Sequence, residues 1–93
     1  MNNLPRISSY GQYDSDNYGV NSLQVQFDSF TLFYSYQTII AYKDNQDGFV
    51  MCKNSWGTTT GKHMNWLDED HSKRIDGNLF EQKLKDMLER HIQ

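Results

Sequence analysis

The chain has 93 residues, of which 37% are hydrophobic and 23% are charged, which leaves room for one small domain. Twelve acidic and nine basic residues give a net charge of -3, which disfavours duplex nucleic acid as a partner because that contact needs a cationic face. Without a long apolar run there is no membrane span, and a single cysteine excludes an internal disulfide and fits a cytoplasmic location.

Residues 1–16 are expected to form a polar, flexible or extended arm ahead of a single domain over residues 17–93. Asn, Ser, Tyr, Gly and Asp dominate residues 1–22, and such a composition buries little apolar surface. In the alternative, Tyr10, Tyr13 and Tyr18 dock on the domain or on a partner, because a tyrosine ring can be buried while its hydroxyl stays in water.

The next part of the chain predicts an antiparallel sheet of three to four strands. Apolar and polar residues alternate there with the period of a half-buried strand. The segment Asp44-Asn45-Gln46-Asp47-Gly48 is typical of a hairpin turn between two strands. The expected strands cover residues 22–28, 30–37, 38–43 and 49–55.

The pattern changes at Trp56. Residues 57–63 are predicted to be a polar loop, residues 64–67 a short apolar turn, and residues 68–74 a charged surface loop.

A C-terminal helix is expected over residues 79–92, with its N-cap in Asp76-Gly77-Asn78. Apolar residues recur at i, i+4, i+7 and i+8, so one stripe of the helix should face the sheet. Glu81–Lys85 and Asp86–Arg90 are spaced to pair on the solvent side. The fold class is therefore α+β, with the C-terminal helix packed on one face of the sheet. The stripe consists of Phe80, Leu84, Met87 and Leu88.

The segment from Trp56 to Trp66 is the best candidate for a ligand site. Glycines let consecutive amides converge on an anion, a lysine adds a point charge, and the two tryptophans could stack on a base or anchor a partner protein. The alternatives are a tight connection whose threonines satisfy their own backbone, and tryptophans that pack in the core, which is the commoner outcome. The spacing is not that of a P-loop. The candidate ligand-binding residues are Trp56, Thr58, Thr59, Thr60, Gly61, Lys62, His63 and Trp66.

Other chemistry has weaker support. A zinc site would need closely spaced ligands, and this spacing is absent among His63, His71 and Cys52. We therefore expect no bound metal, and no other cofactor is expected. Cys52 falls in a predicted strand, where a packed and inert thiol is the default, so we expect no enzymatic activity. A Cys52–His63 pair near the surface is the alternative.

Residues 56–68 read W-G-T-T-T-G-K-H-M-N-W-L-D, which resembles the core W-G-P-T-T-G-K-H-L-N-x-I-D of a family of small proteins from phages, prophages and other mobile elements. Asn17-Tyr18-Gly19 and residues 33–38 match two further segments of that family. Thr58 replaces a proline of the pattern, which loosens the segment, and Tyr34 is an insertion. The resemblance implies a genetic setting more than an activity, and it gives no functional site that could be transferred to this chain.

That setting implies a small phage-type protein that acts by binding. We expect it to inhibit a host defence component in the host cytoplasm through protein–protein contact, as anti-CRISPR proteins do. The alternative is a nucleotide or phosphate-ligand binder, such as a sponge for a signal nucleotide, that uses residues 57–63. A thin core also favours a homodimer, which buries additional surface.

Overall fold

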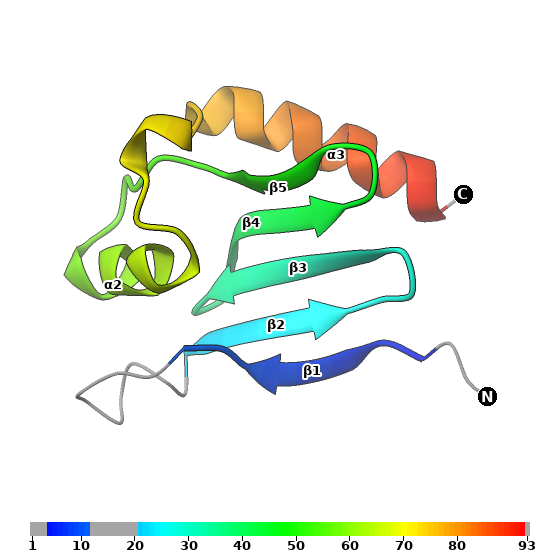
Figure 1. Cartoon of the computed structure of the whole chain (residues 1–93), viewed down its shortest axis with the longest axis horizontal. Coiled ribbons are helices and arrows are strands. Elements are labelled where there is room, and N and C mark those ends of the chain that lie inside the picture. Colours follow the sequence, from blue (N-terminus) through cyan, green and yellow to red (C-terminus); the bar gives the residue numbers. More distant parts are fainter. Residues whose placement is uncertain (1–3, 12–20, 93) are drawn as a thin grey trace.

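The computed structural model describes residues 4–11 and 21–92, which form an antiparallel sheet and two α-helices (Figure 1). The strands are β1 (Arg6–Ser9), β2 (Ser22–Gln26), β3 (Phe30–Ser35), β4 (Thr38–Asp44) and β5 (Gly48–Met51). Each strand pairs with its neighbours in the sequence, in the order β1-β2-β3-β4-β5. The predicted hairpin turn joins β4 to β5, and Gly48 takes the positive φ of 71° that glycine adopts without strain.

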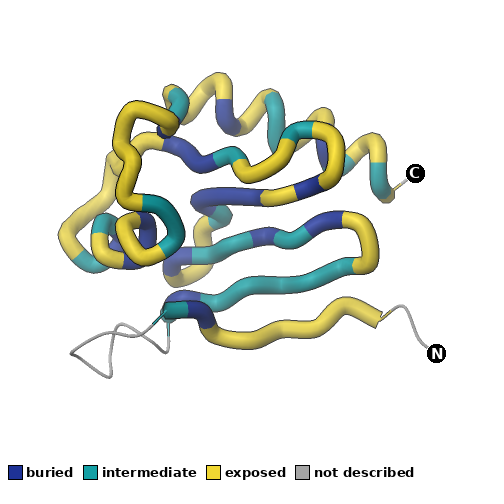
Figure 2. Tube along the Cα trace, viewed as in Figure 1, coloured by how far each residue is buried: buried dark blue, intermediate teal, exposed yellow. Residues whose placement is uncertain are grey.

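The expected three to four strands are an undercount, because the sheet has five. The additional strand, β1, lies within residues 1–16 and pairs with β2 along its whole length, with Ile7 opposite Val25. All four of its residues are exposed (Figure 2), so backbone hydrogen bonds rather than apolar burial hold this edge strand, and composition gives no sign of it. Three earlier expectations lie outside the described residues: the Asn17-Tyr18-Gly19 segment, Tyr13, and the domain boundary between residues 16 and 17.

The helical elements are α2 (Thr58–Leu67), the short 3₁₀ helix η1 (His71–Lys73) and α3 (Gly77–Ile92). The expected C-terminal helix is confirmed as α3, which begins two residues earlier than predicted. Asp76 supplies the expected cap, since its carboxylate accepts a hydrogen bond from the Asn78 N–H at 3.1 Å. The Phe80 ring lies 5.9 Å from the ring of Tyr42, which places α3 on one face of β4.

The core lies between β3, β4, β5 and the two helices (Figure 2). Six of its ten apolar members belong to strands and three to helices, so the helices cover a core that the sheet mainly supplies. The buried core residues are Phe30, Leu32, Ile40, Ala41, Tyr42, Met51, Cys52, Met64, Phe80 and Met87.

The C-terminal end of α3 is tied to the β4–β5 turn by charges. Arg90 donates to the carboxylates of Asp44 at 2.8 Å and Asp47 at 3.2 Å, and His91 Nε2 lies 3.1 Å from Asp44. The predicted Asp86–Arg90 pair is therefore replaced, because two turn carboxylates, one of them fully buried, offer Arg90 stronger hydrogen bonds than an exposed neighbour does.

Candidate functional site

Residues 58–67 form helix α2, so the prediction of a polar loop over 57–63 is wrong. Gly57 is the extended N-cap residue, and its carbonyl accepts the first helical bond from the Gly61 N–H at 3.0 Å. Threonine and glycine are weak helix formers, and tertiary packing overrides them here. The signal was present in the sequence as Thr60, His63 and Met64, which are spaced at i, i+3 and i+4 and are all buried.

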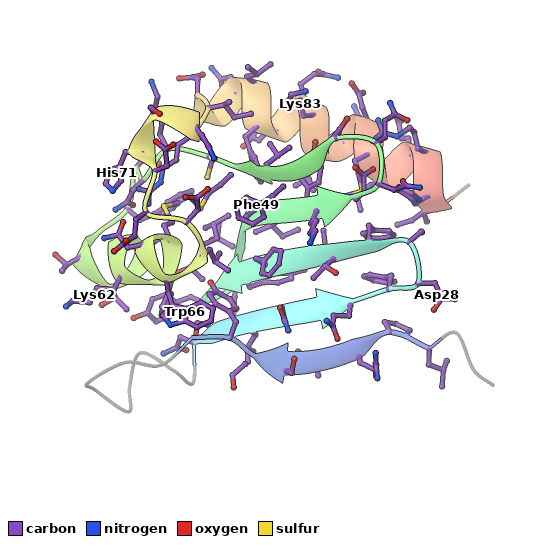
Figure 3. All side chains as sticks on the ribbon, in the orientation of Figure 1. Asp28, Phe49, Lys62, Trp66, His71 and Lys83 are labelled. Carbon is purple, nitrogen blue, oxygen red and sulfur yellow. The ribbon has the colours of Figure 1, made fainter. Side chains whose placement is uncertain are left out.

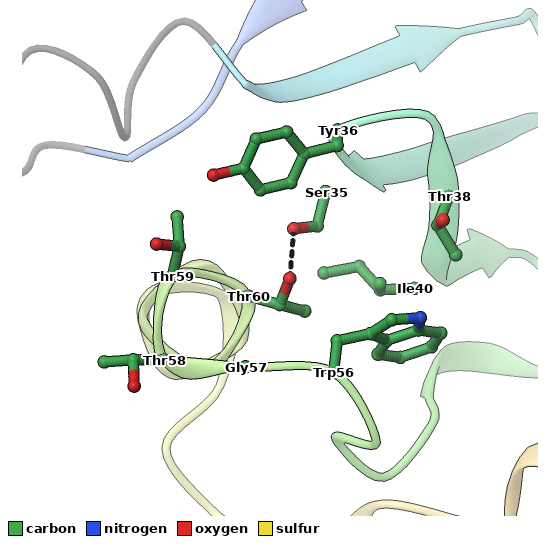
Figure 4. A pocket seen from close by; sticks show the side chains of 9 residues that line it. All are labelled: Ser35, Tyr36, Thr38, Ile40, Trp56, Gly57, Thr58, Thr59 and Thr60. Atoms are coloured by element: carbon green, nitrogen blue, oxygen red, sulfur yellow. Dashed lines mark hydrogen bonds between the residues drawn. The ribbon is translucent and has the colours of Figure 1, made fainter.

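His63 is a structural contact between α2 and the sheet. It has no exposed surface, and its Nδ1 lies 2.8 Å from Ser35 Oγ at the end of β3. The same Ser35 Oγ lies 2.8 Å from Thr60 Oγ1 (Figure 4). The Tyr10 ring packs edge-on at 6.2 Å from the His63 ring. Sequence reasoning missed Ser35, because a serine at a strand end carries no signal of a buried hydrogen-bond partner 28 residues away.

A pocket of about 350 Å³ opens beside this contact, between the β3–β4 turn and the first turn of α2 (Figure 4). Tyr36 and Trp56 line it from opposite sides, and both rings are about half exposed. No side chain caps the N-terminus of α2, and its first turn holds no acidic residue. The lining is therefore neutral, rich in hydroxyls and next to the positive end of a helix dipole. Its residues are Ser35, Tyr36, Thr38, Ile40, Trp56, Gly57, Thr58, Thr59 and Thr60.

Four of the eight candidate ligand residues line this pocket, namely Trp56, Thr58, Thr59 and Thr60. Gly61, Lys62, His63 and Trp66 belong to later turns of α2 and are not among the lining residues. The pocket thus brings together the hydroxyls and one indole ring, and leaves out the lysine and the histidine.

The two tryptophans are half exposed, at 51% for Trp56 and 52% for Trp66, so the core packing that we favoured is not observed. One precedes α2 and the other lies near its C-terminal end, where Figure 3 shows the Trp66 ring beside the helix. Helix α2 therefore presents large aromatic rings to solvent at both ends.

Cys52 has the environment of an inert thiol. It is buried next to Ile75, with which it forms a parallel bridge, and burial raises its pKa to about 11. Among residues 4–11 and 21–92, no cluster of three or more His, Cys, Asp or Glu side chains could hold a metal ion. None of the described helices is both long and apolar enough to cross a membrane.

One family model, described as "Family of unknown function (DUF8033)", matches residues 6–84. The match runs from β1 into α3 and includes all of α2 and the pocket. Neither the curated proteins nor the solved structures yield a significant match to the chain.

Proposed function

We propose that this chain, which belongs to the family of unknown function DUF8033, is a non-enzymatic protein that binds a partner protein through the surface around α2. The observation that carries the proposal is the exposure of Trp56 and Trp66, at 51% and 52%. Half-exposed indole rings are costly in water and are typical anchors of protein interfaces. The reactive side chains nearby, His63 and Cys52, are buried, so this surface offers contact area rather than chemistry.

We further propose that the partner is a component of a host defence system and that binding inhibits it in the cytoplasm. The support is the resemblance of residues 56–68 to proteins carried by phages and other mobile elements. A single domain of 93 residues can block an effector by covering its surface, and this needs no catalytic group.

The test is a plating assay in bacteria that carry one defined defence system. Wild-type protein should restore plating of a phage that this system restricts, and Trp56→Ala combined with Trp66→Ala should reduce the restoration about tenfold or more, as loss of an interface anchor does. Leu79→Ala is the matched control, because Leu79 is equally exposed but lies on α3. Equal restoration by the double variant, with its folding checked by circular dichroism, would exclude the α2 surface.

The pocket beside α2 supports a second candidate function, the binding of a nucleotide or another phosphate ligand. The specific observation is an uncapped helix N-terminus that faces a hydroxyl-rich space of about 350 Å³ with an indole ring on one side. Amides at such a terminus bind phosphate oxygens, and the Trp56 ring could stack on a base. Lys62 is not among the lining residues, so the backbone would supply most of the attraction.

Titration with inorganic phosphate and with adenosine monophosphate tests this candidate. Trp56 fluorescence in a Trp66→Phe background reports on the pocket. Gly57→Asp places a carboxylate at the helix N-terminus and should weaken binding about tenfold or more, whereas the neutral Gly57→Asn should weaken it less. Equal affinities of these two variants would reject the site.

We also propose that the chain forms a homodimer through one flank of α3. Leu84, Leu88 and Ile92 line an apolar groove of about 490 Å³ there, and the charged residues along it are Glu81, Lys85 and Glu89. In an antiparallel copy related by a two-fold axis that passes between residues 86 and 87, Leu84 of each chain lies close to Leu88 of the other, and Lys85 lies close to Glu89. Every favourable contact then occurs twice, as a symmetric interface requires.

A further inference from the structure

The side of the sheet that faces away from α3 is open over most of its width. Phe80 of α3 contacts Tyr42, so Tyr42 lies on the covered side, and the residues before and after it in β4 point to the other side. Helix α2 covers one end of that other side, where Ser35 lies 2.8 Å from His63. Figure 3 views this side, with Phe49 on it, and no helix crosses the middle of the sheet in front of it.

Cross-strand pairing arranges the side chains of this side in rows. Lys43 is paired with Phe49 of β5 and with Thr31 of β3, and paired residues of antiparallel strands point to the same face. The row continues through Gln26 of β2 to Arg6 of β1, so it crosses all five strands. The residues that we call the open face form this row and part of the next one, and none of them is buried; they are Arg6, Ser8, Gln24, Gln26, Thr31, Phe33, Lys43 and Phe49.

Phe33 and Phe49 place two neighbouring aromatic rings on the open face. The Phe49 residue is 36% exposed, and its ring lies 5.7 Å from the ring of the half-buried Phe33 at an angle of 68°. Phe33 therefore supports the Phe49 ring from the side and leaves part of it accessible. Aromatic rings on the strands of an open sheet are a common stacking platform for unpaired bases.

The two cations of the open face are available to bind an anion. Arg6 and Lys43 are both exposed, and among residues 4–11 and 21–92 neither forms an ion pair. They stand three strands apart in one row, a span of about 14 Å that a short single strand of nucleotides can bridge. No Asp or Glu belongs to the open face, although the chain has 12 acidic residues and a net charge of -3. The positive charge is therefore local to this face, where it complements a phosphate backbone.

Two carboxylates lie at the margins of the open face. Asp28 lines a pocket at the β1 end. Asp68 lines a small cavity at the β5 end together with Lys73 and Arg74, so that end carries no net negative charge. Arg74 is only 7% exposed there, which shows that the expectation of a solvated surface loop over residues 68–74 is wrong at this position. The repulsion that remains comes from Asp28, and its removal should strengthen the binding of an anion.

We propose that the open face binds single-stranded nucleic acid. A base stacks on Phe49, Lys43 and Arg6 contact phosphates, and the side-chain amides of Gln24 and Gln26 form hydrogen bonds with the bases between them. A duplex should not bind, because its bases are stacked on one another and do not reach the ring. The inference goes beyond the proposed function, since it assigns a second class of partner to a surface that does not include α2.

The experiment measures the fluorescence anisotropy of a labelled oligothymidine of about eight nucleotides, titrated with the full-length protein at low salt. We expect saturable binding of this strand and little binding of a duplex of the same length. The logarithm of the affinity should fall with the logarithm of the salt concentration with a slope of about -1.4, because each of two phosphate contacts contributes about -0.7. Lys43→Gln should weaken binding about threefold and reduce the slope to about -0.7.

Three further variants locate the site, with circular dichroism as the check on folding. Phe49→Leu should weaken binding about tenfold, because it removes the stacking ring, whereas Phe49→Trp should keep the affinity. Asp28→Asn should strengthen binding about twofold, because it removes a repulsive charge. Lys83→Gln on α3 is the matched control for the loss of one positive charge and should change nothing.

The outcomes separate this proposal from the others. Oligouridine of the same length tells RNA from DNA, and saturable binding of either one supports the proposal. The absence of saturable binding overturns it, as do equal affinities for strand and duplex or equal effects of Lys43→Gln and Lys83→Gln. Loss of plating restoration in Phe49→Leu without any oligonucleotide binding assigns the face to a protein partner and also overturns it. Oligonucleotide binding by a protein that restores no plating supports this proposal and rejects the inhibition of defence, so either can fail alone.

Discussion

At the scale of single residues, Asp44 shows how one side chain joins distant parts of the chain. It follows the last apolar residues of β4, yet its carboxylate is fully buried and contacts Arg90 and His91 at the end of α3. Burial raises its pKa, but hydrogen bonds from the Asp47 backbone N–H, Arg90 and His91 outweigh that effect and lower the pKa to about 2. The charged form therefore stabilises the fold.

Replacing this carboxylate should destabilise the protein and change its response to acid. We expect Asp44→Asn to lower the free energy of unfolding by about 3 kcal/mol at pH 7, because Arg90 loses a charged acceptor. In the wild type the contribution is complete above pH 4 and is lost as the pH falls towards 2, since the folded pKa lies below the ordinary 3.8.

Urea unfolding at pH 7 and at pH 3 measures both effects. The Asn variant should lose less stability between these two pH values than the wild type does. Asp28→Asn, on the exposed β2–β3 turn, is the control and should cost about 0.5 kcal/mol or less. A similar cost for both variants would show that the Asp44 network adds little.

At the scale of elements, the sequence predicted β2, β3, β4, β5 and α3 because each carries a strong local pattern. Strands β2 and β3 showed alternation, β4 carried a β-branched pair, and β5 followed a hairpin turn. Helix α3 showed a stripe at helical spacing together with a cap at Asp76. Apart from the short η1, the missed elements are β1 and α2, which depend on contacts outside their own segment. Strand β1 depends on the backbone of β2, and α2 depends on Ser35 beneath Thr60 and His63.

The same reason limits what could be predicted of the candidate site. The threonines and Trp56 were found by composition, but their grouping with Tyr36 and Thr38 from the β3–β4 turn requires the tertiary fold. The exclusion of His63 from that group and the burial of Arg74 also follow from packing. Residue type alone assigns the arginine to the surface and leaves the position of the histidine open.

Helix α2 can be stabilised at its N-cap, where Gly57 carries no acceptor. A Cβ at Gly57 meets no atom within 4 Å, and its φ of -149° suits any residue. We expect Gly57→Asp to raise the free energy of unfolding by about 0.5 kcal/mol through a cap bond and the helix dipole. Thermal unfolding measures the gain, and Gly57→Ala, which adds no acceptor, should show none. A decrease with Asp would mean that this terminus already has a partner.

At the scale of the whole molecule, one flank of α3 forms the apolar groove lined by Leu84, Leu88 and Ile92, and no described residue covers it completely. Sedimentation equilibrium at high micromolar concentration should give twice the mass of one chain. Leu88→Glu should yield monomers, because it places a charge in the apolar groove. Leu79→Glu, on an exposed position of the same helix outside the groove, should remain dimeric.

A charge exchange tests the orientation of the two chains. Lys85→Glu alone should weaken the dimer, since it sets like charges opposite one another, and Lys85→Glu combined with Glu89→Lys should restore it. A monomeric wild type, or a double variant no better than the single one, would contradict the antiparallel arrangement.

The order of the strands also has a consequence for how the chain folds. Because every strand pairs with its neighbours in sequence, the sheet contacts join residues that are close together in the chain. Such low contact order favours rapid folding. The bonds from Arg90 and His91 to Asp44 span 46 and 47 residues, so they should form late. Amide hydrogens of β3 and β4 should then exchange most slowly with solvent, and those of the outer strand β1 fastest among the strands.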